Sequence, residues 1–194
     1  MEETVLVLAS QSPRRRELLE LMGLHHFLVR PARGEERAPA GLGPGELVEY
    51  LSRQKAREVA GRSRPGELIL GADTVVELEG RILGKPHSEE EAVEMLLSLS
   101  GRSHRVYTGL TLLRGEVCRT EHEVTLVSFA PLSPQRARAY VATGEPMDKA
   151  GAYGIQGRGC VLVEGIRGDY YNVMGLPLCR LGRMLEEFGI NCLP

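Results

Sequence analysis

The feature that most constrains the fold is a regular exchange between short apolar runs and segments with helical spacing. The first example is VLVLASQSPRRRELLELM, residues 5–22, where an apolar run passes through a serine–proline turn into a helix-like segment. Ser12 is a favoured N-cap residue, Pro13 suits the first helical position, and Gly23 is typical of a helix end. Buried strands that exchange with helices in this way indicate an α/β or mixed α+β fold.

The same signals divide the rest of the chain. They predict strands over residues 4–9, 67–72, 106–113, 117–129 and 160–166, and helices over 13–22, 46–60, 89–100, 134–143 and 177–188. A β-hairpin is predicted over 74–85, with its turn at Glu79-Gly80. Loops are predicted over 31–45, which is rich in proline, glycine and charge, and over the glycine-rich residues 145–159. Because the sequence contains no repeat and no convincing linker, we predict one domain over residues 1–194.

Composition excludes several classes of protein. The chain has 194 residues, of which 42% are hydrophobic, enough for a sizeable core. Its formal net charge of -2 gives no global basic field, so we expect neither nucleic acid nor membrane as a partner. No apolar run reaches the roughly 18 residues of a membrane span, and the N-terminus lacks the features of a signal peptide. The four cysteines form no C-x-x-C motif, so we expect reduced cysteines packed as small apolar residues and a cytoplasmic protein.

Three consecutive arginines, Arg14 to Arg16, fall in the first turn of the predicted first helix. Positive charge there opposes the helix dipole and costs stability unless an anion binds nearby. The free N–H groups of a helix start already favour anions, and open α/β sheets bind ligands where strands end and helices begin. A phosphate or triphosphate is therefore the predicted ligand. The simpler interpretation is a solvated basic patch.

A second segment of interest is GADTVVELEGRILGKP, residues 71–86. A turn at Glu79-Gly80 pairs Leu78 with Arg81 and, further out, brings Asp73 beside Lys85 at the open end of the hairpin. An aspartate at a strand end next to a lysine suits metal binding or the activation of water, with the lysine on phosphate oxygens. The alternative is an ordinary surface ion pair.

The third segment is EPMDKAGAYGIQGRG, residues 145–159. Its glycines allow the backbone to approach a ligand closely, and Gln156 offers an amide that both donates and accepts hydrogen bonds. An irregular connection would explain the glycines almost as well. The three segments together, each with polar groups in turns, favour a nucleotide site.

In motifs that occur in the expected order from Leu6 to about Leu181, the chain resembles the Maf family of nucleoside triphosphate pyrophosphatases, once described as septum-formation inhibitors. The motifs are SQSPRRRELL, GADTVV, GKP, GRSHRVYTG, EPMDKAGAYGIQGRG and YYNVMGLPL. The resemblance implies an elongated ITPase-like fold, with a central mixed twisted sheet, flanking helices and a deep cleft between two lobes. It also implies a homodimer, a divalent cation (Mg²⁺ or Mn²⁺), and hydrolysis of a nucleoside triphosphate to monophosphate and pyrophosphate.

The resemblance also implies roles for single residues. Asp73 matches the family's proposed proton acceptor and, with Glu36, its metal site. Arg33 stands where relatives carry the first acidic residue of that metal loop, so the chain departs from the family pattern there. The residues that match phosphate-binding positions are Ser10, Arg14, Arg15, Lys55 and Lys85.

Three markers resemble the branch of the family that acts on dTTP and UTP: SPRR without an insertion, Thr74 after the aspartate, and Gln156. The chemistry of the bases suggests a division of labour. Gln156 can accept from N3–H of uracil or thymine and donate to a neighbouring oxygen, but a flipped amide would also serve cytosine. Arg14, if it reaches O4, can only donate, so it would exclude cytosine. Thr74 would set the width of the pocket.

We therefore expect a dTTP/UTP pyrophosphatase with a house-cleaning role in nucleotide metabolism and a link to septum formation. A rival hypothesis is a nucleotide-sensing regulator of cell division without useful turnover, because Arg33 alters the metal loop. An RNA-binding arm at PRRR is a poorer third, since aromatic residues make up only 5% of the chain and no RNP-like stretch follows.

Overall fold

A computed structural model describes residues 4–193 of the chain, which fall into two compact units. The first unit contains the described residues up to Asp73, together with Thr108–Glu123 and the residues from Gly175 onward. The second contains Thr74–Tyr107 and Val124–Met174. The chain passes from one unit to the other inside three long strands, β3 (Leu68–Leu78), β5 (Ser103–Arg114) and β6 (Val117–Phe129), and once more between Met174 and Gly175. The prediction of a single domain stays a prediction.

The strands are ordered β2-β1-β3-β5-β6-β7, and β4 pairs with β3. In the first unit β1 (Leu6–Leu8) runs parallel to both β2 (Phe27–Val29) and β3. In the second unit β3 pairs antiparallel with β4 (Arg81–Leu83), and β6 pairs antiparallel with β7 (Val163–Arg167). Parallel and antiparallel pairs therefore occur together, which confirms the predicted mixed α/β class.

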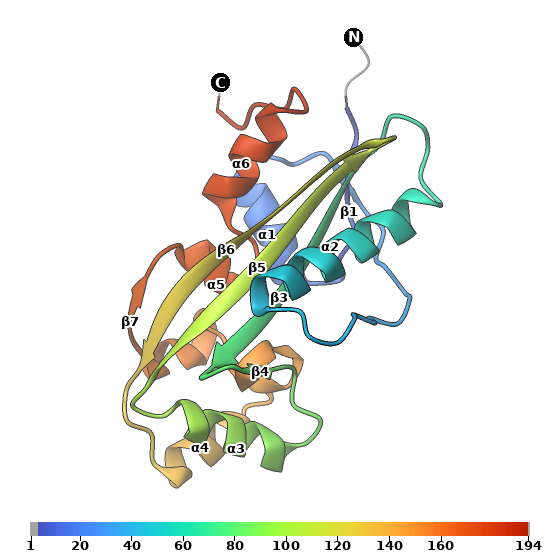
Figure 1. Cartoon of the computed structure of the whole chain (residues 1–194). Coiled ribbons are helices and arrows are strands. Elements are labelled where there is room, and N and C mark those ends of the chain that lie inside the picture. Colours follow the sequence, from blue (N-terminus) through green and yellow to red (C-terminus); the bar gives the residue numbers. More distant parts are fainter. Residues whose placement is uncertain (1–3, 194) are drawn as a thin grey trace. The chain divides into compact units, whose positions relative to one another are not determined.

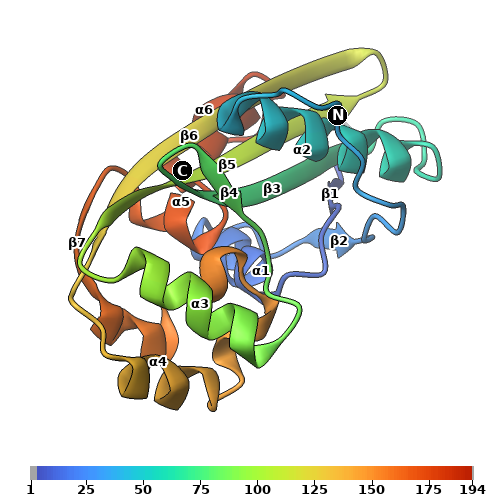
Figure 2. The ribbon, with the colours of Figure 1, turned by 60° about the horizontal axis from the view of Figure 1, so that its bottom comes forward.

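The first unit surrounds its strands with helices α1 (Pro13–Leu21), α2 (Pro44–Ala60) and α6 (Leu178–Glu186). Helix α2 lies along one face of these strands and α1 lies on the other (Figures 1 and 2). Because side chains alternate along a strand and helices cover both sides, β1 is buried on both faces: all three of its residues are buried. The residues that form the core beneath α2 are Val7, Ala9, Ala56, Val59, Ile69 and Leu113.

The second unit contains α3 (Glu89–Leu99), α4 (Pro134–Val141), α5 (Tyr170–Met174) and a run of 3₁₀ turns over Glu145–Asp148, Ala150–Ala152 and Gly157–Leu162. Helices α3 and α4 lie side by side (Figure 2). The core of this unit includes Phe129, packed edge-on against His104 and Tyr153. His104 is buried and shares a 2.7 Å hydrogen bond with the Tyr153 hydroxyl, so it has a structural role.

Most of the predicted elements are confirmed. The turn at Glu79-Gly80 has φ of 50° and 83° at its two central residues, as a type I′ turn requires, and it pairs Leu78 with Arg81 as predicted. Strand β2 and helix α5 were not predicted, because three exposed or half-exposed residues and a single helical turn carry little periodic signal.

Two of the predictions are wrong. Asp73 does not end a strand, because β3 continues through it to Leu78. All four cysteines are free, as predicted, but Cys160 and Cys179 are exposed and do not pack as small apolar residues. Among the helices of residues 4–193, none combines the length and the apolar character needed to cross a membrane.

Candidate active site

The predicted site residues fall into two groups, one in each unit. The first unit holds the phosphate-binding candidates of the first strand–helix turn and the acidic candidates: Ser10, Arg14, Arg15, Glu36, Lys55 and Asp73. The second unit holds the remaining lysine and the two candidates for base selectivity other than Arg14: Thr74, Lys85 and Gln156. Each group is built by its own local packing.

The centre of the first group is an ion pair between Asp73 and Lys55. The Lys55 Nζ donates to Asp73 Oδ1 at 2.6 Å and lies 2.9 Å from Glu36 Oε1, so one ammonium joins two carboxylates. The Lys55 and Asp73 side chains are 15% and 9% exposed, whereas the Glu36 side chain is 53% exposed. One carboxylate is therefore held in the protein interior and the other reaches the site from solvent.

The sequence places Asp73 at Lys55 through the alternation of strand β3. Ile69, Gly71 and Asp73 point to the same face of the strand, because successive side chains alternate, and this is the face that α2 covers. At Gly71 a Cβ atom would lie only 2.2 Å from the Ser52 carbonyl oxygen. Glycine therefore lets α2 lie almost in backbone contact with β3, and Lys55 follows Ser52 by three residues, close to one turn along the same side of the helix.

Burial controls the protonation of Asp73. Removal from water raises the pKa of this carboxyl above its ordinary value, while Lys55 and Arg15 oppose the rise and Glu36 adds to it. A carboxylate with a raised pKa binds a proton more readily than one in water. That is the property that a proton acceptor in catalysis needs.

The first strand–helix turn adds hydroxyl and guanidinium groups. Ser10 lies two residues after the end of β1. Its Oγ accepts hydrogen bonds from Ser12 N and Arg15 Nη1, both at 3.2 Å. Arg15 Nε also donates to the Gly175 carbonyl oxygen at 2.8 Å, which fixes the guanidinium. Burial lowers the pKa of Arg15, as does Arg14, while Asp73 and Glu36 raise it. The first turn of α1 contains no acidic residue, so the local charge at this helix start is positive.

The altered acidic loop still delivers a carboxylate to the site. The Glu58 carboxylate on α2 accepts the backbone N–H groups of Arg33 and Gly34, at 2.8 and 2.9 Å. These hydrogen bonds lower the pKa of Glu58 and tie the loop to the helix. Because the loop is held through its backbone, the side chain at position 33 is not needed to bring Glu36 to Lys55.

In the second unit the three predicted residues differ in exposure. Thr74 is half-buried within β3, whereas Lys85, two residues after β4, and Gln156 are exposed. The β3–β4 ladder includes the predicted pair of Val76 and Leu83 but extends no further toward Lys85. Because Asp73 and Lys85 belong to different units, their predicted proximity stays a prediction.

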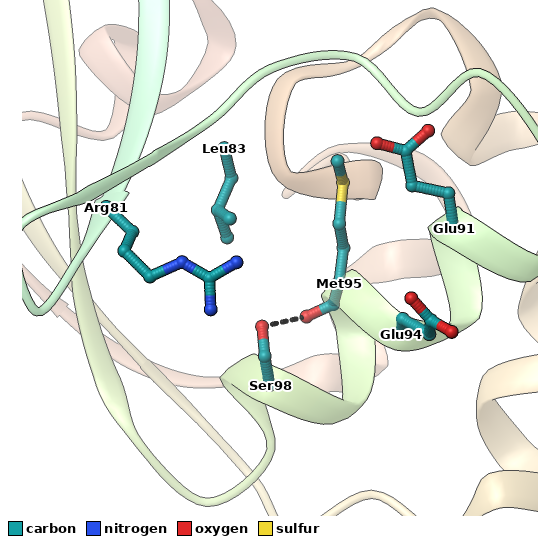
Figure 3. A pocket seen from close by; sticks show the side chains of 6 residues that line it. All are labelled: Arg81, Leu83, Glu91, Glu94, Met95 and Ser98. Atoms are coloured by element: carbon teal, nitrogen blue, oxygen red, sulfur yellow. Dashed lines mark hydrogen bonds between the residues drawn. The ribbon is translucent and has the colours of Figure 1, made fainter.

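The second unit also has a pocket of about 260 Å³ between β4 and α3, apart from the predicted site residues. Figure 3 shows Arg81 and Leu83 on one side of it and the side chains of α3 on the other. The lining residues are Arg81, Leu83, Glu91, Glu94, Met95 and Ser98. They mix both charges and include no nucleophile activated by a base, so the pocket offers no evident chemistry.

A family model for Maf-like proteins matches residues 5–188 of the chain. The chain belongs to the Maf family. It is 54% identical over 184 residues to a dTTP/UTP pyrophosphatase of Symbiobacterium thermophilum, an alignment that covers 95% of this chain and 94% of the relative. It is 53% identical over 189 residues to a dTTP/UTP pyrophosphatase of Moorella thermoacetica, covering 96% of each chain. Among solved structures, the chain is distantly similar to the crystal structure of a dITP/XTP pyrophosphatase from Mycobacterium abscessus. The TM-score is 0.47 and the sequence identity 15%, over 95% of this chain and 97% of that one.

A divalent cation fits this Maf site only if the phosphates of a bound nucleotide supply part of its coordination. Within residues 4–193 no three His, Cys, Asp or Glu side chains are grouped to hold a metal ion, and the site offers the carboxylates of Asp73 and Glu36. Mg²⁺ is commonly bound by one or two carboxylates together with substrate phosphates and water, so two carboxylates suffice in the presence of a triphosphate.

The sequence did not reveal the groups that support these residues. Glu58, which holds the acidic loop, and Glu145 and Tyr140, which contact the backbone around Gln156, were not singled out. Each acts on residues that become neighbours only in the folded chain. A glutamate or tyrosine on a helix gives no signal of such a role in a single sequence.

Proposed function

We propose that this Maf protein hydrolyses dTTP and UTP to the nucleoside monophosphate and pyrophosphate. The observation that carries the proposal is the identity of 54% and 53%, over nearly the full length of both chains, to two proteins named dTTP/UTP pyrophosphatase. The ion-paired and buried Asp73 supplies a chemistry consistent with that reaction.

In this proposal Asp73 orients a water molecule toward the α-phosphorus and accepts a proton from it as the water oxygen attacks. The bond between the α-phosphorus and the bridging oxygen to the β-phosphorus breaks, and pyrophosphate leaves. Arg14, Arg15, Lys55 and Lys85 bind the triphosphate and offset the negative charge that develops on the leaving group.

A divalent cation, Mg²⁺ or Mn²⁺, would be held by Asp73 and Glu36 and by phosphate oxygens. Its chemistry would be to polarise the phosphate oxygens and to lower the pKa of a bound water. Lys55 holds both carboxylates together at 2.6 and 2.9 Å, so it would pre-set the spacing of the two protein ligands.

Base selectivity is assigned to Arg14, Thr74 and Gln156. Gln156 would accept from N3–H and donate to a neighbouring oxygen of uracil or thymine. Arg14 would donate to O4. Cytosine has an amino group at that position, so the Arg14 donor would find no acceptor there. Thr74 would leave room for the ring.

The direct test measures pyrophosphate release from UTP, dTTP, CTP and GTP with Mg²⁺ or Mn²⁺, and with EDTA as the metal-free control. We expect UTP and dTTP to have the highest kcat/KM and EDTA to abolish turnover. No release from any triphosphate would exclude the pyrophosphatase. Equally fast release from CTP and GTP would support the pyrophosphatase reaction but would contradict the roles of Arg14, Thr74 and Gln156 in base selectivity.

The rival candidate is a nucleotide sensor without useful turnover, which Arg33 in the acidic loop favours. Measurable nucleotide binding with no turnover under any metal condition would support it.

We further propose that the protein is a cytoplasmic homodimer and that its activity is linked to septum formation. A mass near 21.3 kDa by light scattering at micromolar concentration would contradict the dimer.

A further inference from the structure

One carboxylate, that of Glu145, binds the backbone on the far side of Gln156. Its Oε2 accepts from Arg158 N at 2.9 Å, and its Oε1 accepts from Gly159 N at 3.0 Å. Glu145 opens the first 3₁₀ turn after α4, directly after Gly144, whose φ of 75° turns the chain. Glu145 therefore fixes the segment that follows Gln156 although it precedes that residue by eleven positions.

A phenol, that of Tyr140, binds the backbone on the near side of Gln156. Tyr140 lies in the last turn of α4 and is 6% exposed. Its hydroxyl donates to Glu145 Oε1 at 2.8 Å and accepts from Gly154 N at 3.1 Å. Tyr140 and Glu145 thus form one hydrogen-bonded pair that holds the chain two residues before Gln156 and two and three residues after it.

The glycines of this segment show how closely it lies on the pair. A Cβ atom at Gly157 would lie 2.8 Å from the Glu145 carboxylate, and φ there is +82°. A Cβ atom at Gly159 would lie 2.7 Å from the Tyr140 hydroxyl and 2.2 Å from the Gly154 carbonyl oxygen. Only glycine allows the chain to turn back on itself within this space.

The pair is itself anchored by Lys149. Lys149 Nζ donates to the Glu145 carbonyl oxygen at 2.5 Å, which anchors the glutamate backbone. Partial burial acts to raise the pKa of Glu145, but the N–H groups of Arg158 and Gly159 and the Tyr140 hydroxyl outweigh it and leave the pKa below its ordinary value. The carboxylate therefore stays ionised, and able to accept all three hydrogen bonds, throughout the neutral pH range.

We propose that Glu145 and Tyr140 form a clamp that holds the Gln156 loop, residues 154–159, in one conformation before a nucleotide binds, and that this clamp, by positioning Gln156, acts together with Arg14 in the preference for uracil over cytosine. The inference rests on the proposed function, in which Gln156 reads the base. Glu145 and Tyr140 are positioning residues: they act on the loop backbone and through it on the Gln156 amide.

The physical reason lies in the two faces of an amide. Gln156 is exposed and can present either its oxygen or its nitrogen to the base, so on a mobile loop it could serve cytosine as well as uracil. A loop fixed at both ends has few ways to adapt and loses less entropy when the correct base binds. The contribution of Gln156 to selectivity then depends on the clamp, whereas affinity for the triphosphate does not.

The test compares Glu145→Gln and Tyr140→Phe with the wild type. The amide of a glutamine cannot accept on both sides, so at least one of the two loop N–H groups loses its acceptor. Tyr140→Phe removes the acceptor of Gly154 N. We expect each variant to lower the ratio of kcat/KM for UTP to that for CTP by up to about tenfold, because a loop that is no longer held loses more entropy when the correct base binds. Inhibition by inorganic tripolyphosphate, which has no base, should not change.

The double variant should lose little more selectivity than the worse single variant, because the two side chains act through one hydrogen-bonded unit. Matched controls are Glu164→Gln, an exposed glutamate on β7, and Tyr50→Phe, a 38% exposed tyrosine on α2. Neither control should change the ratio. Because the ratio is measured within one preparation, it does not depend on the fraction of folded enzyme.

A second readout does not need turnover. Hydrogen exchange followed by mass spectrometry should show faster exchange in the peptide covering residues 154–159 in both clamp variants, with protection elsewhere unchanged. If Gln156→Glu alters the UTP-to-CTP ratio but the clamp variants leave the ratio and the exchange rate unchanged, the clamp is wrong while the proposed function stands. If the wild type does not prefer UTP to CTP, the assignment of base selectivity to Arg14, Thr74 and Gln156 is wrong, and the clamp proposal falls with it.

Discussion

Asp73→Asn replaces the proposed proton acceptor with an amide of the same shape, and the structure predicts opposite effects on stability and on turnover. Asp73 is 7% exposed, and burial raises its pKa despite the ammonium of Lys55 at 2.6 Å. A raised pKa means that the folded protein disfavours the ionised form more than water does. At any pH above the ordinary pKa of an aspartate, Asp73 therefore costs folding free energy relative to a neutral side chain of the same shape.

The amide removes this cost without leaving Lys55 unpaired, because its Nζ also lies 2.9 Å from Glu36 Oε1. Stabilising substitutions of this kind contribute about 0.5–2 kcal/mol, and we expect a gain of about 1 kcal/mol at pH 8. For a chain of this length that corresponds to a rise in Tm of about 2–4 °C. The wild type binds more protons folded than unfolded between its two Asp73 pKa values, so its stability falls as pH rises through that window. The advantage of the amide should therefore shrink as pH falls through that window and vanish below both values.

Turnover should change in the other direction. An amide cannot accept the proton of the attacking water, and the loss of a general base typically lowers kcat by about 10²–10⁴-fold. Urea unfolding in steps from pH 8 to below 3.8 gives the stabilities of both proteins across the window, and pyrophosphate release from UTP gives kcat, with Glu164→Gln as the surface control. An Asp73→Asn protein less stable than the wild type at pH 8 would refute the reasoning from burial. Wild-type turnover would refute the catalytic role.

Three further predictions follow from single contacts. Gln156→Glu should lower kcat/KM for UTP by about tenfold or more, because a carboxylate cannot donate to the base, while inhibition by tripolyphosphate stays unchanged. Gly71→Ala should cost about 1–3 kcal/mol in urea unfolding, and lower activity, because its Cβ would lie 2.2 Å from the Ser52 carbonyl oxygen on α2; Gly165→Ala, with nothing within 4 Å, is the control. Burial lowers the pKa of His104 to about 4 although Glu77 opposes the shift, so the wild type should lose stability as pH falls from about 6.5 to 4, and His104→Gln should flatten this loss in unfolding measurements.

Features set by neighbouring residues could be predicted from the sequence. Serine is a favoured N-cap residue: Ser12, Ser88 and Ser133 all stand at the N-caps of their helices, and the hydroxyls of Ser88 and Ser133 accept from the N–H three residues on, at 3.1 and 3.3 Å, whereas Ser12 makes no such side-chain hydrogen bond. The hairpin turn at Glu79-Gly80 also fixed the register of its two strands correctly. In each case the geometry is decided within four or five residues, so the local sequence carries enough information.

Contacts between distant residues could not be predicted in the same way. The sequence indicated Asp73 as the acid and Lys85 as its partner, because the two flank one hairpin. The structure shows an ion pair that this reasoning did not predict, between Asp73 and Lys55, eighteen positions away and on a helix. Only the family resemblance had assigned Lys55 to the site, and it gave no partner for it. The clamp of Tyr140 and Glu145 gave no signal for the same reason, since the backbone it binds becomes its neighbour only on folding.

The packing that creates the Asp73 ion pair also explains its chemistry. Gly109 on β5 repeats the role of Gly71 on the neighbouring strand: a Cβ there would lie 2.3 Å from the carbonyl oxygen of Val48, one turn before Ser52 on α2. Two glycines on adjacent strands thus let one side of the helix lie almost against the backbone of the sheet. This close approach brings Lys55 to Asp73, and it also excludes the water that would otherwise keep the pKa of Asp73 at its ordinary value. A bulkier residue at either glycine should loosen the ion pair, which raises the pKa of Asp73, and admit water, which lowers it. Because burial is the largest cause of the raised pKa, the net change should be a fall, so stability and the acid limb of the pH–rate profile should change together.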